Sequence, residues 1–537
     1  MHLKVKPAES QILNATSTDW LVVFVTINVL YVSLRTIYHL YFNPLAKYPG
    51  PFLAKISSLP SFYHACKGDR HIWLWQCFQI YGSKIRTTPN TVLFNSPKAY
   101  QDIYNIKANV KKNKTYDAWR RNEEDINTLN VTNVAVHAYK RRLLNTVFTD
   151  SSVRSAASFI IRHLDRWNEL SLNQETPGDW SKSIDMAKWM DCMVFDVMTD
   201  LCFGKSANIK EPGHNPYKTI PEAVISYMQF MHPVRPRGLN YLLDKITPPD
   251  IKRYYEFLES SVSERIELER SLEQAGQKQG KELRKDMLYY LYRATDPETG
   301  RPAYPKNELL AETSLLIIAG SDTTSVSLCG FFFYITHYPR VYKKLVEHIR
   351  STFSSVDEIS EGSKLTSCHY LRACIDEAMR LTPAGPSELS RTILHGGLQV
   401  DGEYFPEGAN VGTAGWSNGH NDDNYGGDSE VFRPERWIVD PENGNTAEQV
   451  AHIKSCFHPF SSGPGNCAGQ NLAKLEMMLV TARTLYRMDI RIAPGSTLGE
   501  GRPELGWGRR NRNSFQLEDA YVAIRHGPML QFRQREE

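Results

Sequence analysis

The feature that most constrains this 537-residue chain is one cysteine placed among glycines directly before a helical pattern. The stretch reads Phe460-Ser-Ser-Gly463-Pro-Gly-Asn-Cys467-Ala-Gly469, and apolar residues recur at helical spacing from Gln470 onward. Because backbone N–H groups and the helix dipole favour an anion at a helix N-terminus, the pattern predicts a thiolate at Cys467. Gly463 and Gly469 allow the backbone to bend and a flat ligand to approach closely. A structural buried cysteine is the alternative interpretation.

A second unusual pattern interrupts the long apolar segment 307–338, which we expect to be a helix through the interior. Ala319-Gly320-Ser-Asp322-Thr323-Thr is unfavourable helix chemistry for a buried segment, and such local inconsistency marks candidate functional sites. Gly320 removes a side chain where a ligand could lie against the helix. A threonine hydroxyl that bonds backward can open a groove there. A packing defect with a solvated aspartate is the alternative.

The first stretch resembles the cysteine loop FxxGx(R/H)xCxG of the cytochrome P450 family, and the second resembles that family's (A/G)GxDTT motif. The resemblance extends in the family's order from the Pro/Gly hinge 48–51 to Gln470, and it is to fungal microsomal members. It implies the cytochrome P450 fold, mainly α with a small β-rich subdomain. It also implies haem as cofactor, with its iron axially ligated by Cys467 and with Phe460, Gly463 and Gly469 around it. One departure is Gly465, where the family usually has a basic residue for a haem propionate; haem retention should therefore rest more on other cations.

The resemblance assigns roles to the mid-helix residues. Thr323 would supply the hydroxyl that organises the water network around oxygen, and Asp322 would be its proton-relay partner. Ala319 and Gly320 complete this catalytic set.

A third set of residues is structural. Glu377-Ala-Met-Arg380 places opposite charges at i,i+3, but the chain repeats this spacing at 267–270 and 388–391, so the spacing alone predicts little. The later segment Phe432-Arg-Pro-Glu-Arg436-Trp resembles a second family motif. Together they imply a buried charge triad of Glu377, Arg380 and Arg436 that fixes the cysteine loop.

Three residues are candidates for the haem propionates. Arg391 begins a predicted strand and matches a family arginine. His137-Ala-Tyr-Lys-Arg141 is similar to the family's WxxxR segment, with His for Trp, and would present two donors at i,i+4. An ordinary basic helix face is the alternative for this pair. The competing pair at 119–120 is disfavoured because the acidic run 123–125 follows it.

The N-terminal segment is apolar enough to anchor the chain in a membrane. Residues 20–34 carry no charge, and the apolar character continues to Phe42 if Arg35 snorkels to the headgroups. We expect a lumenal tip at 1–19 with a glycosylation sequon at Asn14, a transmembrane anchor at 20–42 and a catalytic domain at 43–537. Basic residues after the span, including Lys47, place that domain on the cytosolic side of the endoplasmic reticulum. A cleaved signal peptide is the alternative.

Composition narrows the class of protein further. The net charge of +3 gives no indication of a nucleic-acid partner. The nine cysteines are scattered and none forms a CxxC pair, which argues against a disulfide framework and a zinc knuckle. Helices are expected at 184–203, 251–274 and 307–338, and β-like pieces at 87–94, 392–400 and 521–531.

The resemblance implies a monooxygenase that inserts one oxygen atom of O2 into a lipophilic small molecule, which we expect to belong to secondary metabolism. Electrons would come from a separate NADPH-dependent reductase that docks near Lys140, Arg142 and Lys474. Segments 116–134, 226–231 and 384–389 and the helix around residue 318 are expected to line the substrate pocket. Two alternatives stay open: a haem-thiolate isomerase or dehydratase that needs no reductase, and an inactive membrane-tethered binding protein.

Overall fold

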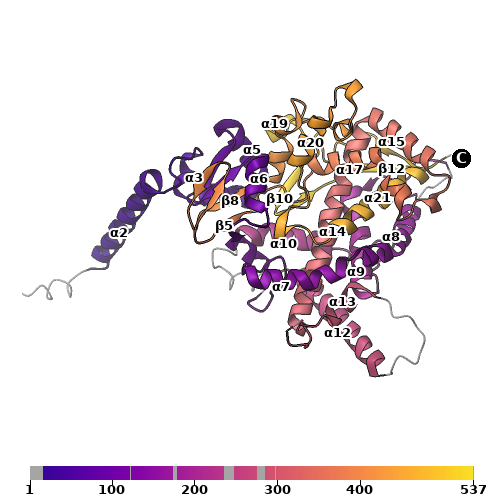
Figure 1. Cartoon of the computed structure of the whole chain (residues 1–537), viewed down its shortest axis with the longest axis horizontal. Coiled ribbons are helices and arrows are strands. Elements are labelled where there is room, and N and C mark those ends of the chain that lie inside the picture. Colours follow the sequence, from indigo (N-terminus) through magenta and orange to yellow (C-terminus); the bar gives the residue numbers. More distant parts are fainter. Residues whose placement is uncertain are drawn as a thin grey trace, which may run out of the picture.

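One long helix stands apart from the rest of the molecule. The computed structural model describes residues 16–120, 122–172, 178–234, 247–274, 285–296 and 298–535. Figure 1 shows α2 (Ser17–Ile37) projecting from one side, while the remaining helices and small sheets form a single body. Most side chains of α2 are exposed, so this apolar helix has no protein surface to pack against.

The helices of the body carry most of the chain. Its α-helices are α3 (Phe52–Ile56), α4 (Leu59–Lys67), α5 (Arg70–Tyr81), α6 (Pro97–Tyr104), α7 (Val134–Leu144), α8 (Asp150–Ser171), α9 (Met186–Phe203), α10 (Ile220–Val234), α12 (Pro249–Gln274), α13 (Met287–Arg293), α14 (Lys306–His337), α15 (Pro339–Thr352), α16 (Ser363–Thr366), α17 (His369–Leu381), α18 (Gly415–Gly419), α19 (Asp422–Tyr425), α20 (Ala447–Cys456) and α21 (Gln470–Arg487). Short 3-10 turns are η2 (Lys114–Trp119), η3 (Asn145–Phe148), η5 (Val356–Glu358), η6 (Pro434–Trp437), η7 (Pro441–Asn443), η8 (Gly463–Gly465) and η9 (Pro503–Leu505).

Within the described residues, the strands form four small sheets. They are β1 (Lys84–Thr88), β2 (Thr91–Phe94), β3 (Val110–Lys112), β4 (Ile184–Asp185), β5 (Arg391–Ile393), β6 (Leu398–Val400), β7 (Glu403–Phe405), β8 (Asn410–Thr413), β9 (Met488–Ile492), β10 (Leu517–Ala520), β11 (Val522–Arg525) and β12 (Met529–Gln534). The largest sheet has the order β1-β2-β8-β5-β3, and the others are β4-β12-β9, β10-β11 and β6-β7. This is the predicted class, mainly α with a small β-rich part.

The predicted helices are confirmed to within two residues at each end. α9 begins at Met186 because the Asp185 side chain caps the Ala187 amide, and it ends at Gly204, whose φ of 73° suits glycine. The prediction of each strand was wrong in one respect, because the structure has two shorter strands where the sequence predicted one. Pro89-Asn90, Gly396-Gly397 and Gly527-Pro528 break the runs, and turn chemistry at these positions outweighs the β-branched and aromatic residues around it.

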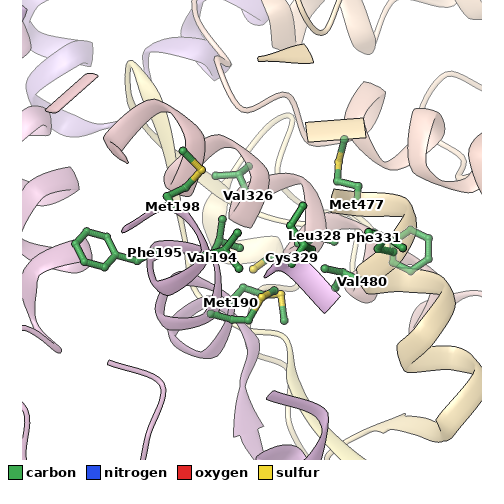
Figure 2. Packing of buried hydrophobic residues seen from close by; sticks show 14 of the residues in the cluster. Met190, Val194, Phe195, Met198, Val326, Leu328, Cys329, Phe331, Met477 and Val480 are labelled. Carbon is green, nitrogen blue, oxygen red and sulfur yellow. The ribbon is translucent and has the colours of Figure 1, made fainter. Parts of the chain in front are cut away.

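The core is built around α14, which passes through the middle of the body (Figure 1). Figure 2 shows Val194 of α9, Cys329 of α14 and Val480 of α21 within one cluster of buried side chains. These three side chains are fully buried. Burying each valine stabilises the fold by about 2 kcal/mol, so α14 is held rigidly against both neighbours.

The segment before the body is one continuous helix. α2 starts at a capping box between Thr16 and Asp19, and it continues as a π-helical turn, η1 (Tyr38–Phe42). The combined 26 residues rise about 39 Å, which is enough to cross a hydrocarbon core of about 30 Å. The helix begins at Ser17 rather than at residue 20, and the predicted sequon at Asn14 lies outside the described residues. α14 is also long and apolar, but 72% of its most apolar window is buried inside the protein.

Candidate active site

A cavity of about 400 Å³ lies in the middle of the body. Segments far apart in the sequence meet around it: β3, α7, the middle of α14, the start of β5 and the loop that precedes α21. The predicted site residues that line it are His137, Arg141, Ala319, Gly320, Thr323, Arg391, Phe460, Cys467 and Gly469. The structure therefore brings the motifs of the cysteine loop, the mid-chain helix and the basic residues to one place.

Cys467 lies three residues before the first residue of α21. Its amide donates to the Phe460 carbonyl at 2.8 Å, which closes the loop around η8. The Cys467 side chain is exposed towards the cavity, and protein surrounds its other sides. Burial raises the pKa of the Cys467 thiol, although the Gly469 amide and the charges of Arg141 and Lys474 lower it. A metal ion bound to the sulfur would displace the proton and give the thiolate that the sequence predicts.

The glycines of the cysteine loop, Gly463 and Gly469, have different structural roles. Gly463 has a φ of +62°, and a Cβ on it would lie 2.1 Å from the Tyr104 carbonyl oxygen, so the loop packs against α6 only with glycine here. A Cβ on Gly469 would touch the Phe148 ring at 3.4 Å. Gly469 lines the cavity and Gly463 supports the loop from behind.

The basic residues converge on the cavity. Arg141 donates to the carbonyl of Asn466 and, at 2.7 Å, to its side-chain oxygen, which ties α7 to the cysteine loop. Arg391 donates to the Tyr116 hydroxyl at 3.0 Å. Burial, together with the charges of Lys112, Arg141 and Arg391, lowers the pKa of His137 to about 3. Lys112, which the sequence did not single out, belongs to the same group.

The positive charges at the cavity suit haem, the cofactor that the resemblance implies. Within the described part of the chain, the cations Lys112, Arg141 and Arg391 line the cavity beside the neutral His137, and none of the three has a carboxylate ion-pair partner. Buried charges of one sign are unfavourable unless an anion joins them. Haem carries two propionates, and the cysteine sulfur lines the same cavity. The residues present therefore fit haem, and the competing Arg120 is instead paired with Asp117 at 3.6 Å.

The middle of α14 presents only part of its motif to the cavity. The Thr323 hydroxyl lines the cavity and donates to the Ala319 carbonyl at 2.7 Å. Gly320 also lines it, and a Cβ there would lie 2.6 Å from Cε of Met198, a side chain of α9 that lines the same cavity.

Asp322 does not line the cavity, because consecutive helical residues point about 100° apart. Its carboxyl is buried, and its Oδ2 has no hydrogen-bond partner among the described residues. Burial and the nearby charge of Asp191 raise its pKa to about 8, against the opposing effect of Arg525. Asp322 is thus a protonated carboxylic acid at neutral pH, on a side of α14 that the cavity does not reach.

The charge triad has the geometry that the sequence predicted. Glu377 accepts from Arg380 Nε and Nη2 and from Arg436 Nε, each at 2.8 Å. Trp437 Nε1 adds a further bond at 2.9 Å, and all three charged side chains are buried. Burial alone would raise the pKa of Glu377, but the two arginines lower it to about 2. Arg380 also donates to the carbonyls of Gly419 and Ser429, which ties α17 to the segment that leads to the cysteine loop.

Two functional expectations were wrong, and the sequence missed Glu476 as well as Lys112. Residues 226–231, which all lie in the described part of α10, contribute nothing to the cavity wall. Lys140 is buried and paired with Glu308 and Glu312, so it is not available on the surface. Glu476 of α21 lines the cavity, and burial raises its pKa to about 8. Its place nine residues after Cys467 was the only sequence signal for it.

A cysteine sulfur, a set of unneutralised cations and a helix with a backward-bonded threonine around one cavity define a haem-thiolate site. Comparisons with known proteins agree with this assignment of the site. The family model for cytochrome P450 matches residues 47–504. The chain is 33% identical to the cytochrome P450 monooxygenase poxM of Penicillium oxalicum over 94% of its length and 93% of the relative's. It is 32% identical to the cytochrome P450 monooxygenase AKT7 of Alternaria alternata, over 96% and 99% of the two chains. The chain belongs to the cytochrome P450 family.

Proposed function

We propose that this chain is a haem-dependent monooxygenase that inserts one oxygen atom of O2 into a lipophilic small molecule of secondary metabolism. The observation that carries the proposal is that the sulfur of Cys467 and the hydroxyl of Thr323 line one cavity. Leu315, Leu316, Pro383, Ala384 and Leu389 also line it, which suits an apolar substrate. The relatives' printed names support the reaction class.

Each residue at the cavity would have its own role in the reaction. Cys467 would hold the iron, and Arg141 and Arg391, with His137 beside them, would hold the propionates. Haem bound through a thiolate supplies oxygen activation, since the sulfur favours cleavage of the O–O bond. Thr323 offers a hydroxyl at the cavity wall that can position a water molecule. The carboxyl of Asp322, the residue before Thr323, holds a proton. It would transfer this proton only after its side chain rotates.

The triad and the loop glycines position the sulfur. The ion pairs of Glu377 lock α17 against η6, and Gly463 lets the loop pack on α6. Rigid support of this kind holds a reacting group within the narrow range of geometry that catalysis needs.

The electron donor is proposed to be a separate NADPH-dependent reductase. Arg142 is exposed on α7, and Lys474 is partly exposed on α21 close enough to Cys467 to affect its pKa. These two side chains are the remaining candidates for its docking surface.

The chain is further proposed to be a single-pass protein of the endoplasmic reticulum, with its catalytic domain, residues 43–537, in the cytosol. The exposed apolar surface of α2 and η1 supports an anchor. Arg35 donates to the Tyr31 hydroxyl at 3.3 Å and to His39 Nε2 at 3.4 Å, so its charge lies against polar groups of the same helix. Lys47 and Lys55 follow the span on the side of the body.

Labelling with 18O2 tests the proposed reaction. Cells that produce the chain together with a reductase should accumulate a metabolite that carries one 18O atom, and Cys467→Ala should abolish it. Turnover that proceeds without NADPH and without 18O would instead indicate the isomerase or dehydratase alternative.

A further inference from the structure

One aspartate joins two walls of the cavity that are far apart in the sequence. The first is the wall loop, residues 383–389 between α17 and β5, which contributes Ser387 and several neighbours to the cavity surface. The second is Tyr521, the single residue between β10 and β11. Asp519 of β10 does not line the cavity itself, but it is buried and its side chain contacts both walls.

The carboxyl group of Asp519 uses one oxygen for each wall. Oδ2 accepts a hydrogen bond from the Ser387 hydroxyl, and Oδ1 accepts one from the Tyr521 amide at 3.0 Å. The Asp519 amide donates to the Gly68 carbonyl at 2.7 Å, which fixes β10 against the turn between α4 and α5. Asp519 therefore forms a clamp between the wall loop and Tyr521, and a third element holds this clamp in place.

The backbone of Tyr521 has a conformation that needs such support. Its φ is +74°, in the left-handed region that a bulky side chain rarely adopts. Conformations of this kind cost free energy and persist only where the surrounding structure enforces them. The Asp519 side chain does so by bonding to the amide two residues on, and the Tyr521 ring meets the Tyr116 ring edge to face, with 6.0 Å between their centroids. The direction of the Tyr521 side chain at the cavity wall thus depends on Asp519.

The wall loop also has attachments other than the clamp. The Ala523 amide donates to the Ala384 carbonyl at 2.9 Å, and Arg70 Nη2 donates to Glu388 Oε1 at 2.5 Å. Arg70 interacts electrostatically with Asp519 as well. Because these contacts remain when the Asp519 carboxyl is removed, the wall loop should stay folded without it. The clamp then decides the position of the loop relative to Tyr521, not whether the loop forms.

On the basis of the proposed haem site, we infer that Asp519 is a positioning residue for the substrate. It holds the wall loop and Tyr521 in one arrangement and thereby determines which lipophilic molecules fit between them. A wall that is fixed before binding loses less conformational freedom when the ligand binds. Without the clamp, a ligand large enough to touch these walls binds more weakly, whereas a ligand too small to touch them binds as before.

Two haem ligands of different size test the inference without reference to activity. Imidazole and 4-phenylimidazole bind haem iron through nitrogen and shift its Soret band, so titration of the holoenzyme gives a Kd for each. The preference for 4-phenylimidazole over imidazole, taken as the ratio of the two Kd values, measures what the walls contribute and does not depend on the fraction of protein that carries haem. Asp519→Ala should lower this preference about ten-fold, the effect of losing a buried hydrogen bond.

Two variants separate the clamp from a general loss of structure. Glu518→Gln is the matched control, because Glu518 points to the opposite face of β10 and is partly exposed, and its preference should stay within about two-fold of the wild-type value. Asp519→Asn keeps an acceptor for the Tyr521 amide and gains an NH2 group that can donate to the Ser387 hydroxyl. It should therefore also stay within about two-fold of the wild type.

A double variant separates the clamp from a direct contact between Ser387 and the ligand. Ser387→Ala should lower the preference in the wild-type background and have no further effect in the Asp519→Ala background, because the bond that it breaks is already lost there. An unchanged preference in Asp519→Ala, an equal fall in Glu518→Gln or in Asp519→Asn, or an additive loss in the double variant would overturn the inference. A wild-type protein that shows no Soret shift with imidazole would instead overturn the proposed function.

Discussion

Replacing Glu377 with glutamine keeps the shape of the side chain and removes the negative charge that two buried arginines share. The carboxylate accepts five hydrogen bonds: two from Arg380, one each from Arg436 and Trp437, and one from the Arg433 amide. A glutamine offers one oxygen and one NH2 group, so at least two of these donors would face another donor. Breaking a buried ion pair from one side costs about 3–5 kcal/mol.

The pKa of Glu377 gives an independent value for the stability that its carboxylate contributes. A value lowered from 4.5 to about 2 corresponds to about 3 kcal/mol of stability. Because the folded-state pKa is the lower one, this contribution is fully present above pH 4.5 and is lost as the pH falls towards 2. The stability difference between wild type and Glu377→Gln should therefore be about 3 kcal/mol at pH 7 and roughly half of that at pH 3.

Urea unfolding followed by far-UV circular dichroism at pH 7 and pH 3 measures both differences. Glu267→Gln is the control, since Glu267 begins the same ExxR spacing on an exposed face of α12 and should change stability by less than about 0.5 kcal/mol. A loss below about 1 kcal/mol for Glu377→Gln, or a loss that is the same at both pH values, would refute the reasoning.

Three further changes have defined outcomes. Asp322→Asn should remove a loss of stability that the wild type shows as the pH rises from about 4 to about 8, because the folded state keeps the proton up to a pKa of about 8 and the unfolded carboxyl releases it near 3.8. Unfolding at pH 5 and pH 8 checks this, and an unchanged pH dependence in the variant would contradict it. Gly320→Ala should change stability by less than about 1 kcal/mol, because its methyl group meets only the flexible end of Met198 at 2.6 Å and alanine favours a helix over glycine by about 1 kcal/mol; thermal unfolding measures the change. Thr323→Val removes the hydroxyl that bonds to Ala319 and should lower product formed per NADPH consumed by about ten-fold, with haem content unchanged. Normal coupling in that variant would remove Thr323 from the proposed mechanism.

Much of the site could be predicted from local sequence patterns. The cysteine loop, the mid-helix motif and the pair of ExxR and PERW-like segments each lie within about ten residues, and their spacing already fixes which groups can share a face. The resemblance of these segments to the cytochrome P450 motifs, and not their local spacing, is why Thr323, Arg141, Arg391 and the triad partners of Glu377 could be placed at one site.

What could not be predicted depends on tertiary packing. Helical spacing shows that Asp322 and Thr323 point apart, but not which of them faces the cavity. Lys111 and Lys112 look equivalent in sequence, and only the pairing of β3 with β5 buries the second one. Lys140 was misjudged for the same reason, because Glu308 and Glu312 of α14 reach it from a distant part of the chain.

The most direct test of the whole account is the ligand of the iron. The carbon-monoxide difference spectrum of the reduced protein should show the band of thiolate-ligated haem in the wild type and in Cys456→Ala, whose cysteine is buried away from the cavity wall. The band should be absent in Cys467→Ala. A Cys467→Ala protein that retained it would contradict the assignment of this sulfur and the site built around it.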